Sequence, residues 1–303
     1  MEYKKKAALL LAVISVLAIA LILSFIFDSE RVARRSSSYT WLDSRFLPLA
    51  DRIEIRGQRG TITLLRKNNI WVMPDAHNVQ IEYPVKQIRV DDMLAALSRR
   101  ANYPVRSTSR EMERKGFGDD SSRITVYGGA GLPLLDMLIG YTDLSGGEVF
   151  LRKIGQSEIR SGADVFTMYT ENDKTFWYDL RLFPDLTAAM VQRVHLISAT
   201  EELILRRSGN NWINENTGAV ISNGETYLRS LLDAQGEDFV SDLTGFEVFG
   251  SIVLELGDGS IVTIYLGQAG NRQLANIRGS RLFYLLGDWT VKRIWPDNWN
   301  YRE

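Results

Sequence analysis

The chain begins with one long apolar segment and then changes to shorter alternations of apolar and polar residues. Residues 7–27 contain only two polar side chains, Ser15 and Ser24. A helix of these 21 residues is about 31 Å long, which matches the hydrocarbon core of a bilayer. Lysines precede the segment, as in a cleavable signal peptide, but an apolar signal core is usually only about 7–15 residues and no small-x-small cleavage site follows Phe27. The pattern therefore predicts an uncleaved signal anchor.

The charges beside this segment bear on its orientation. Three lysines precede it and three arginines follow it, so the positive-inside count is balanced. A short N-terminal segment is easily retained, and a large C-terminal body translocates largely regardless of its charge. We expect a single-pass protein of the bacterial inner (cytoplasmic) membrane, with residues 1–27 as cytoplasmic stub and anchor. The lipid bilayer is then a partner through residues 7–27, and the C-terminal body is extracytoplasmic.

An internal repeat follows a polar stem at 28–50. Residues 52–73 and 193–214 share alternating strand patterns, a basic pair, an Asn-Asn dipeptide and a tryptophan. The two tryptophans, Trp71 and Trp212, lie 141 residues apart. Because equivalent aromatic residues in repeats bury large areas, we expect both to be core anchors. The repeat predicts two tandem domains, at 51–187 and 188–303.

Each predicted domain combines one main helix with several strands. Apolar residues at helical spacing predict helices that start at Val90 and Gly224, with Asp91 and Glu225 near the starts, where a carboxylate opposes the helix dipole favourably. Glycine-rich turns at 128–131 and 257–259 predict hairpins, and a further hairpin follows each of them. The predicted fold class is therefore α+β, with each domain built as strand–strand–helix–strand–strand–strand–strand and largely antiparallel.

Several of these features together resemble the bacterial domain of unknown function 4340 family (DUF 4340). The motifs that carry the resemblance are IEI at 53–55, RKNNIW at 66–71, KGFGDDSSRITVY at 115–127, EVFLRKIG at 148–155 and FWYDLRLFP at 176–184. The resemblance implies an envelope component encoded beside ABC transporters of the gliding-motility or auxiliary type. It therefore implies ABC transporter subunits as membrane partners. The family has no established catalytic residues, so the resemblance supplies none.

Composition excludes several classes of function. The chain has 36 Lys and Arg against 37 Asp and Glu, which excludes a globally basic nucleic-acid binder. It has no cysteine and only two histidines, which excludes disulfides, thiolate sites, cysteine nucleophiles and multi-histidine metal sites. No phosphate-binding loop of the ATPase type is present. We therefore predict no enzyme, no cofactor and no bound metal. A hydrolase with two converging carboxylates stays open as a third interpretation.

Five residues are candidates for an interaction surface. Trp299 and Tyr301 follow the second repeat and have no counterpart in the first, so they form either an exposed contact or a cover over the end of the second domain. Arg106, Arg110 and Arg114 lie in a basic stretch that suits anionic headgroups or an acidic partner, or is simply solvated. The leading hypothesis is a non-enzymatic membrane protein that scaffolds or assists an ABC-type transport complex. The alternative is a module that binds envelope polysaccharide or the cell wall.

Overall fold

The computed structural model describes Ser15 and residues 17–19, 37–78, 80–108, 115–118, 121–142, 146–209, 211–241 and 243–295. Most of the predicted anchor lies outside these residues, and the part that is described, Ser15 and residues 17–19, is helical. Across the described ranges, no helix has the combined length and apolar character that would let it span a bilayer.

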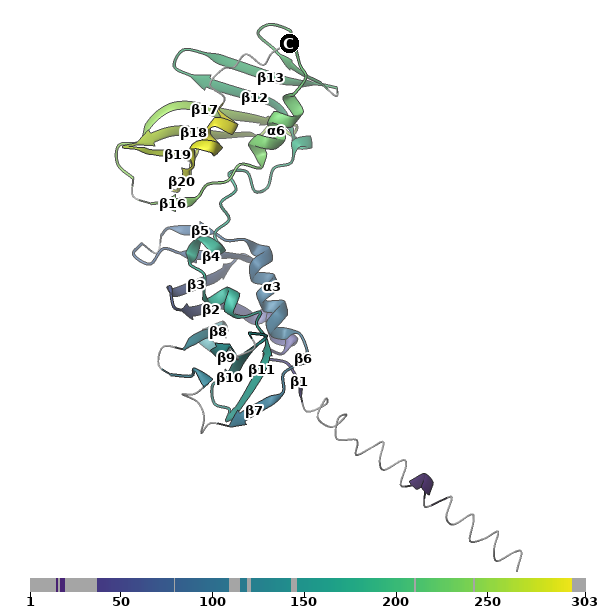
Figure 1. Ribbon diagram of the computed structural model, residues 1–303. Coiled ribbons are helices and arrows are strands. Elements are labelled where there is room, and N and C mark those ends of the chain that lie inside the picture. Colours follow the sequence, from purple (N-terminus) through teal and green to yellow (C-terminus); the bar gives the residue numbers. More distant parts are fainter. Residues whose placement is uncertain are drawn as a thin grey trace, which may run out of the picture. The chain divides into compact units, whose positions relative to one another are not determined.

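The first sheet has nine strands in the order β5-β4-β3-β2-β8-β9-β10-β11-β7 (Figure 1). In chain order its strands are β2 (Ala50–Gly57), β3 (Gly60–Lys67), β4 (Ile70–Pro74), β5 (Glu82–Pro84), β7 (Val105–Thr108), β8 (Ser122–Gly128), β9 (Leu132–Thr142), β10 (Glu148–Lys153) and β11 (Glu158–Ala163). Helix α3 (Gln87–Ser98) follows the edge strand β5, and β7 then forms the opposite edge.

The second sheet also has nine strands, in the order β15-β14-β13-β12-β17-β18-β19-β20-β16. In chain order its strands are β12 (Val191–Ser198), β13 (Glu202–Ser208), β14 (Asn211–Asn214), β15 (Val220–Ile221), β16 (Asp238–Val240), β17 (Glu247–Leu256), β18 (Ile261–Ala269), β19 (Arg272–Ile277) and β20 (Phe283–Leu286). Helix α6 (Gly224–Leu232) again separates the two edge strands in the chain.

Both sheets follow one plan. Four strands lead to one edge, a helix follows, a short strand forms the other edge, and four more strands fill the remaining positions. The protein is therefore mostly antiparallel β with few helices, and its two similar β-sheet bodies are consistent with the predicted internal repeat. The prediction of six strands in each was too low. It missed β4, β5 and β7 and their counterparts β14, β15 and β16, which have only two to five residues each.

The remaining elements are short. They are β1 (Ser38–Tyr39), which pairs with β6 (Ala101–Asn102), the 3-10 turns η1 (Ser44–Leu49), η4 (Gly129–Gly131) and η5 (Ala188–Met190), and the helices α4 (Thr167–Thr170), α5 (Lys174–Trp177) and α7 (Asp288–Ile294). The predicted hairpins are confirmed, because η4 joins β8 to β9 and residues 257–259 lie in the turn between β17 and β18.

The start of α3 differs from the prediction. The helix begins at Gln87 rather than Val90, so Asp91 lies beyond its first turn and the expected contact with the helix dipole is wrong. The reason is local hydrogen bonding. The Gln87 side chain accepts from the backbone nitrogen of Trp71 at 2.8 Å and donates to the carbonyl of Trp71 at 2.9 Å, which fixes the first turn three residues earlier.

The two repeated tryptophans are core residues, as predicted. Trp71 is 3% exposed and Trp212 is 2% exposed. The Trp212 indole Nε1 donates to the Glu225 carboxylate at 3.2 Å, and Glu225 lies in the first turn of α6. That hydrogen bond, with the charge of Arg207, holds the pKa of Glu225 below its ordinary value. In both sheets, therefore, a side chain at the start of the helix binds the repeated tryptophan.

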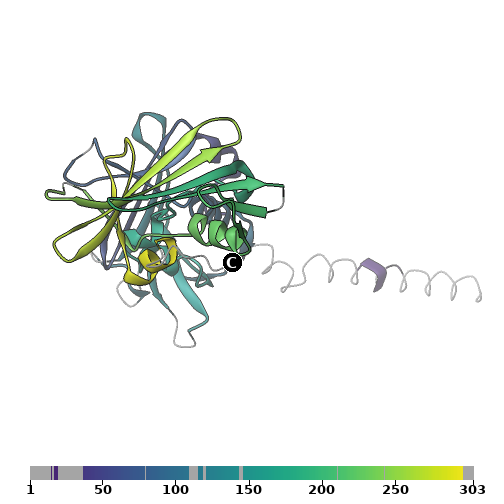
Figure 2. The same cartoon turned by 90° about the horizontal axis from the view of Figure 1, so that it is seen from above.

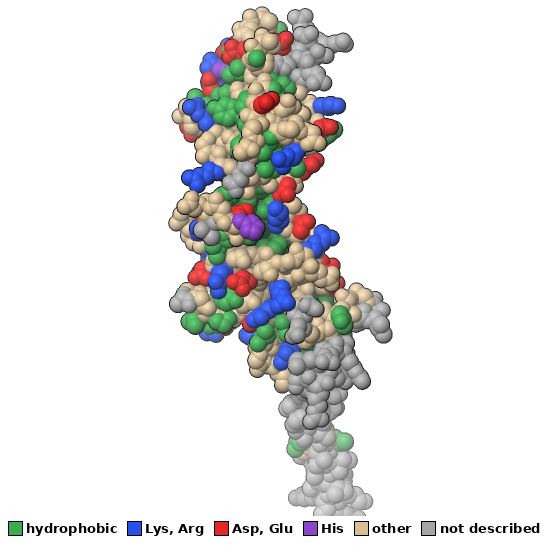
Figure 3. All heavy atoms as spheres, turned by 90° about the vertical axis from the view of Figure 1, so that its left-hand side faces the viewer, with side chains coloured by type: hydrophobic (Ala, Val, Ile, Leu, Met, Phe, Trp, Pro, Cys, Tyr) green, Lys and Arg blue, Asp and Glu red, His purple; other side chains and the backbone are tan. Residues whose placement is uncertain are grey.

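Side chains alternate between a buried and a polar face on the central strands. On β2, Ile53 and Ile55 are buried, whereas Arg52 and Glu54 point to the polar face. The Arg52 guanidinium lies 3.9 Å from the centre of the Tyr127 ring. Its counterpart on β12, Arg193, forms an ion pair of 2.9 Å with Glu255. Figure 3 shows Lys and Arg interspersed with Asp and Glu over one side of the molecule.

By contacts, the chain divides into two compact units. Unit 1 comprises residues 1–62 and 90–172, and unit 2 comprises residues 63–89 and 173–303. The predicted domain division at 187/188 stays a prediction. Within unit 2, α6 and α7 lie next to each other (Figure 2), and the Tyr227 hydroxyl on α6 donates to the Ile294 carbonyl on α7 at 2.8 Å.

Candidate functional site

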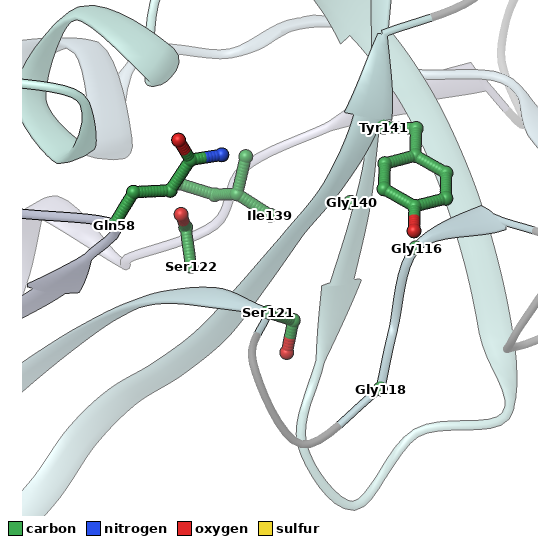
Figure 4. A pocket seen from close by; sticks show the side chains of 8 residues that line it. All are labelled: Gln58, Gly116, Gly118, Ser121, Ser122, Ile139, Gly140 and Tyr141. Carbon is green, nitrogen blue, oxygen red and sulfur yellow. The ribbon is translucent and has the colours of Figure 1, made fainter.

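A cavity of about 370 Å³ opens in unit 1 and is called the unit 1 cavity below (Figure 4). Its walls come from the β2–β3 turn, the loop before β8, the start of β8 and the end of β9. The residues that line it are Gln58, Gly116, Gly118, Ser121, Ser122, Ile139, Gly140 and Tyr141. The cavity thus joins three strand ends that are far apart in the sequence.

The loop before β8 shapes one wall of this cavity. Gly116 has a φ of +84°, a left-handed conformation that favours glycine. The next residue, Phe117, is 8% exposed, and its ring packs against Gly140 on β9. A Cβ at Gly140 would lie 2.1 Å from the Lys115 carbonyl oxygen. Glycine at this position therefore lets the loop lie directly on the strand. We call residues 115–118 the first Gly-Phe loop.

The second sheet also has a Gly-Phe dipeptide that packs against a strand glycine. Gly245 has a φ of +76°, and Phe246 follows it. A Cβ at Gly267 on β18 would lie 2.4 Å from the Glu247 carbonyl oxygen and 2.5 Å from the Phe246 ring. The two Gly-Phe dipeptides are 129 residues apart, a spacing that sequence analysis alone could have matched to the repeat.

The described residues that line the unit 1 cavity carry neutral groups. Gln58 contributes an amide, Ser121 and Ser122 contribute hydroxyls, and Tyr141 contributes a phenol that is 65% exposed (Figure 4). Amides and hydroxyls both donate and accept hydrogen bonds. This arrangement can bind a polar, uncharged molecule, and none of the eight lining side chains is a carboxylate, amine or imidazole that would act as a general acid or base.

Arg123, which follows the lining residue Ser122, is paired within the sheet. Arg123 donates to Asp136 through Nε at 2.7 Å and through Nη2 at 2.5 Å. The Thr125 hydroxyl also donates to this carboxylate, at 3.3 Å. The hydrogen bonds to Asp136 raise the pKa of Arg123. The hydrogen bonds of this arginine therefore join β8 to β9.

Of the five predicted interaction residues, only Arg106 lies among the described residues. It is on the edge strand β7, where Nη2 donates to the Glu148 carboxylate at 2.9 Å and Nε donates to the Ser161 hydroxyl at 2.8 Å. Arg110, Arg114, Trp299 and Tyr301 lie outside the described residues.

The strongest shifts of pKa are found in an aromatic cluster of unit 2. The Phe239 ring packs between two tyrosines. Its centre lies 5.0 Å from that of Tyr178 and 4.8 Å from that of Tyr284. Burial raises the pKa of Tyr284 to about 12 and raises that of Tyr178 further. Both hydroxyls therefore stay protonated at neutral pH, and the cluster contributes packing to unit 2.

A solitary aromatic side chain is exposed on α7. Trp289 is 70% exposed, and the Arg293 guanidinium lies 4.6 Å from the centre of its ring. Exposed tryptophan beside arginine is a composition typical of contact surfaces between proteins.

In the part of the chain that the structure describes, no three His, Asp or Glu side chains converge in a way that would hold a metal ion. His195 lies on β12 in an alternating strand pattern, with Nε2 3.2 Å from the Glu255 carboxylate.

Comparison with protein-family models, curated proteins and solved structures found no match for this chain. The resemblance to the DUF 4340 family therefore stays a prediction from the sequence motifs.

Proposed function

We propose that this protein is a non-enzymatic, single-pass membrane protein whose duplicated extracytoplasmic domains assist an ABC-type transport complex. The observation that carries the proposal is the occurrence of one nine-strand plan twice in a chain that also has an apolar segment of bilayer length at residues 7–27. Two tandem β domains on such an anchor suit a scaffold, because each offers sheet edges and a polar face to partners. The transporter itself is proposed from the resemblance to DUF 4340.

Photo-crosslinking in native membranes tests this proposal. A photoreactive amino acid would replace Trp289, which is 70% exposed, and in a second variant Trp299. We expect a crosslink to an ABC permease or its associated subunit, identified by mass spectrometry. Placing the same amino acid at Ile261, which is 60% exposed in a hairpin of the second sheet, controls for random collisions. Absence of transporter subunits from the crosslinked products at both tryptophan positions would contradict the proposal.

A second candidate function is binding of envelope polysaccharide or the cell wall. The observation that favours it is the unit 1 cavity, whose lining is neutral and polar and includes an exposed tyrosine. Cavities of about 300–1,000 Å³ are the usual size of small-molecule sites, and this one, at about 370 Å³, falls in that range.

A further inference from the structure

The two similar sheets differ at one corner. In the first sheet Ser122 pairs with Ile139, and in the second sheet Gly250 pairs with Leu266. On β9 the residue after Ile139 is Gly140, and on β18 the residue after Leu266 is Gly267. A Gly-Phe dipeptide packs against each of these two glycines. Ser122 and Gly250 therefore occupy equivalent positions in the shared plan.

The second sheet fills this corner with an aromatic ring. A Cβ at Gly250 would lie 2.5 Å from the six-membered ring of Trp295, which follows α7. The Trp295 ring also packs edge-on against Phe249, with ring centres 6.0 Å apart. In the first sheet the equivalent Ser122 faces the open unit 1 cavity instead. A corner that is packed in one copy of the plan is thus open, and lined by hydroxyls, in the other.

The chemistry of the open corner defines what fits it. We propose that the unit 1 cavity binds one or two sugar residues of a neutral glycan, with Gln58, Ser121 and Ser122 as hydrogen-bonding groups and Tyr141 as the stacking surface. This inference rests on the second candidate function and gives it a site. It does not depend on the transporter partnership.

Two features of the lining favour a sugar. Sugar hydroxyls donate and accept hydrogen bonds at once, and so do the amide of Gln58 and the hydroxyls of Ser121 and Ser122. A sugar ring also has an apolar face of C–H groups, which packs well on an exposed aromatic ring such as Tyr141.

The same lining disfavours a charged ligand. A phosphate or carboxylate is normally bound by Arg, Lys or the start of a helix. None of the eight lining residues is basic, and the cavity is bounded by strands, a turn and a loop. The backbone at Gly116, Gly118 and Gly140 is also accessible to the hydroxyls of a ligand.

Gly118 permits a bulky variant at the cavity wall that does not disturb the fold. An added Cβ there would meet no atom within 4 Å, and its backbone is outside the left-handed region. Gly118→Phe therefore adds a ring to a residue of the cavity wall, and we expect this ring to obstruct the cavity. Gly129 in η4 is equally open and also outside the left-handed region, so Gly129→Phe is the matched control.

The test measures sugar binding by the full chain in lipid nanodiscs, because maltoside detergents carry sugar headgroups. Saturation-transfer NMR and calorimetry would use maltose and N,N′-diacetylchitobiose as neutral probes and glucose 6-phosphate as the charged probe. We expect at least one neutral disaccharide to bind, with affinity lowered about tenfold or more by Gly118→Phe and unchanged by Gly129→Phe. Loss of the stacking ring in Tyr141→Ala is expected to lower affinity roughly fivefold.

Three results would overturn the inference. They are no saturation transfer to either disaccharide, binding of glucose 6-phosphate as tight as that of the neutral sugars, or undiminished binding by Gly118→Phe. Circular dichroism shows whether the Gly118→Phe protein is folded. If it is unfolded, Ser122→Ala replaces it as the test, because this substitution removes only one hydroxyl and is also expected to lower the affinity for the sugar. Crosslinking at Trp289 reports on the transporter partnership separately, so either proposal can fail alone.

Discussion

Replacement of Trp212 by alanine is expected to lower the free energy of unfolding of the second sheet by about 3–5 kcal/mol. The indole is 2% exposed, and its side-chain atoms fill the space beside Gly224, where a Cβ would come within 2.4 Å of them. The substitution also removes the hydrogen bond to Glu225, leaving that carboxylate with its arginine partners alone. Cavity formation is the larger part of the expected loss.

Urea denaturation followed by circular dichroism measures this effect as a lower midpoint of the transition. Trp289→Ala is the matched control, because that tryptophan is 70% exposed, and we expect it to change stability by no more than about 0.5 kcal/mol. Equal effects of the two substitutions would show that Trp212 does not anchor the second sheet.

Substitution of alanine for Gly267 or Gly140 is expected to destabilise the corresponding sheet by about 2–3 kcal/mol. The new methyl group would lie 2.4 Å from a backbone carbonyl oxygen at Gly267 and 2.1 Å from one at Gly140. Because these contacts are with backbone rather than with the end of a flexible side chain, the backbone must move away from the strand. At Gly140 this displaces the first Gly-Phe loop, and the buried Phe117 loses packing. At Gly267 it displaces the start of β17 at Glu247, next to the half-buried Phe246.

Thermal unfolding of each single variant tests this expectation. Gly129→Ala is the control, since its Cβ would meet no atom within 4 Å, and its melting temperature is expected to equal that of the unmodified protein. If Gly140→Ala and Gly267→Ala melt at that same temperature too, the loops do not lie on β9 and β18 as described.

The sequence was sufficient for the features that repeat as local patterns. The hairpin at 257–259, the anchoring positions of Trp71 and Trp212, and the start of α6 at Gly224 all follow from alternation, turn glycines and helical spacing. These patterns depend only on residues close together in the sequence. Each can therefore be recognised in both copies, and its occurrence in one copy supports its assignment in the other.

Short strands and helix ends were harder to predict. β15 has two residues and β5 has three, which is too short for an alternation to be recognised. Their place at the sheet edge is set by the helix that follows. The start of α3 at Gln87 likewise depends on a hydrogen bond to Trp71, 16 positions earlier, which no periodicity reveals.

The cavity could not be predicted from the sequence, because it forms where the described part of the first sheet has no aromatic ring at the position that Trp295 fills in the second sheet. Gln58, Ser122 and Tyr141 are ordinary residues for a turn and for strand ends, and only the pairing of β8 with both β2 and β9 brings them together. One signal was available in the sequence, the Gly-Phe dipeptide at 116–117 and again at 245–246. It marks the wall of the cavity but not the open corner, which appears only when Ser122 is compared with Gly250 beside Trp295.

One strand plan occurs twice in this protein, with the same pairing of strands that are distant in the chain. The chain has no cysteine, so engineered pairs report on this pairing without ambiguity. Glu54 pairs with Thr125 between β2 and β8, and the equivalent residues His195 and Val253 pair between β12 and β17. Directly opposed residues in antiparallel strands have Cα atoms about 4.5–5.5 Å apart, which suits a disulfide.

Oxidation of the two double-cysteine proteins, read by the gel mobility of maleimide-labelled chains, is the most direct test. We expect Glu54→Cys with Thr125→Cys, and His195→Cys with Val253→Cys, to form intramolecular disulfides. Pairs shifted by one residue, to Val126 or Leu254, should not, because neighbouring side chains on a strand point to opposite faces. Disulfide formation in only one sheet, or equal formation in the shifted pairs, would show that the two sheets do not share one strand plan.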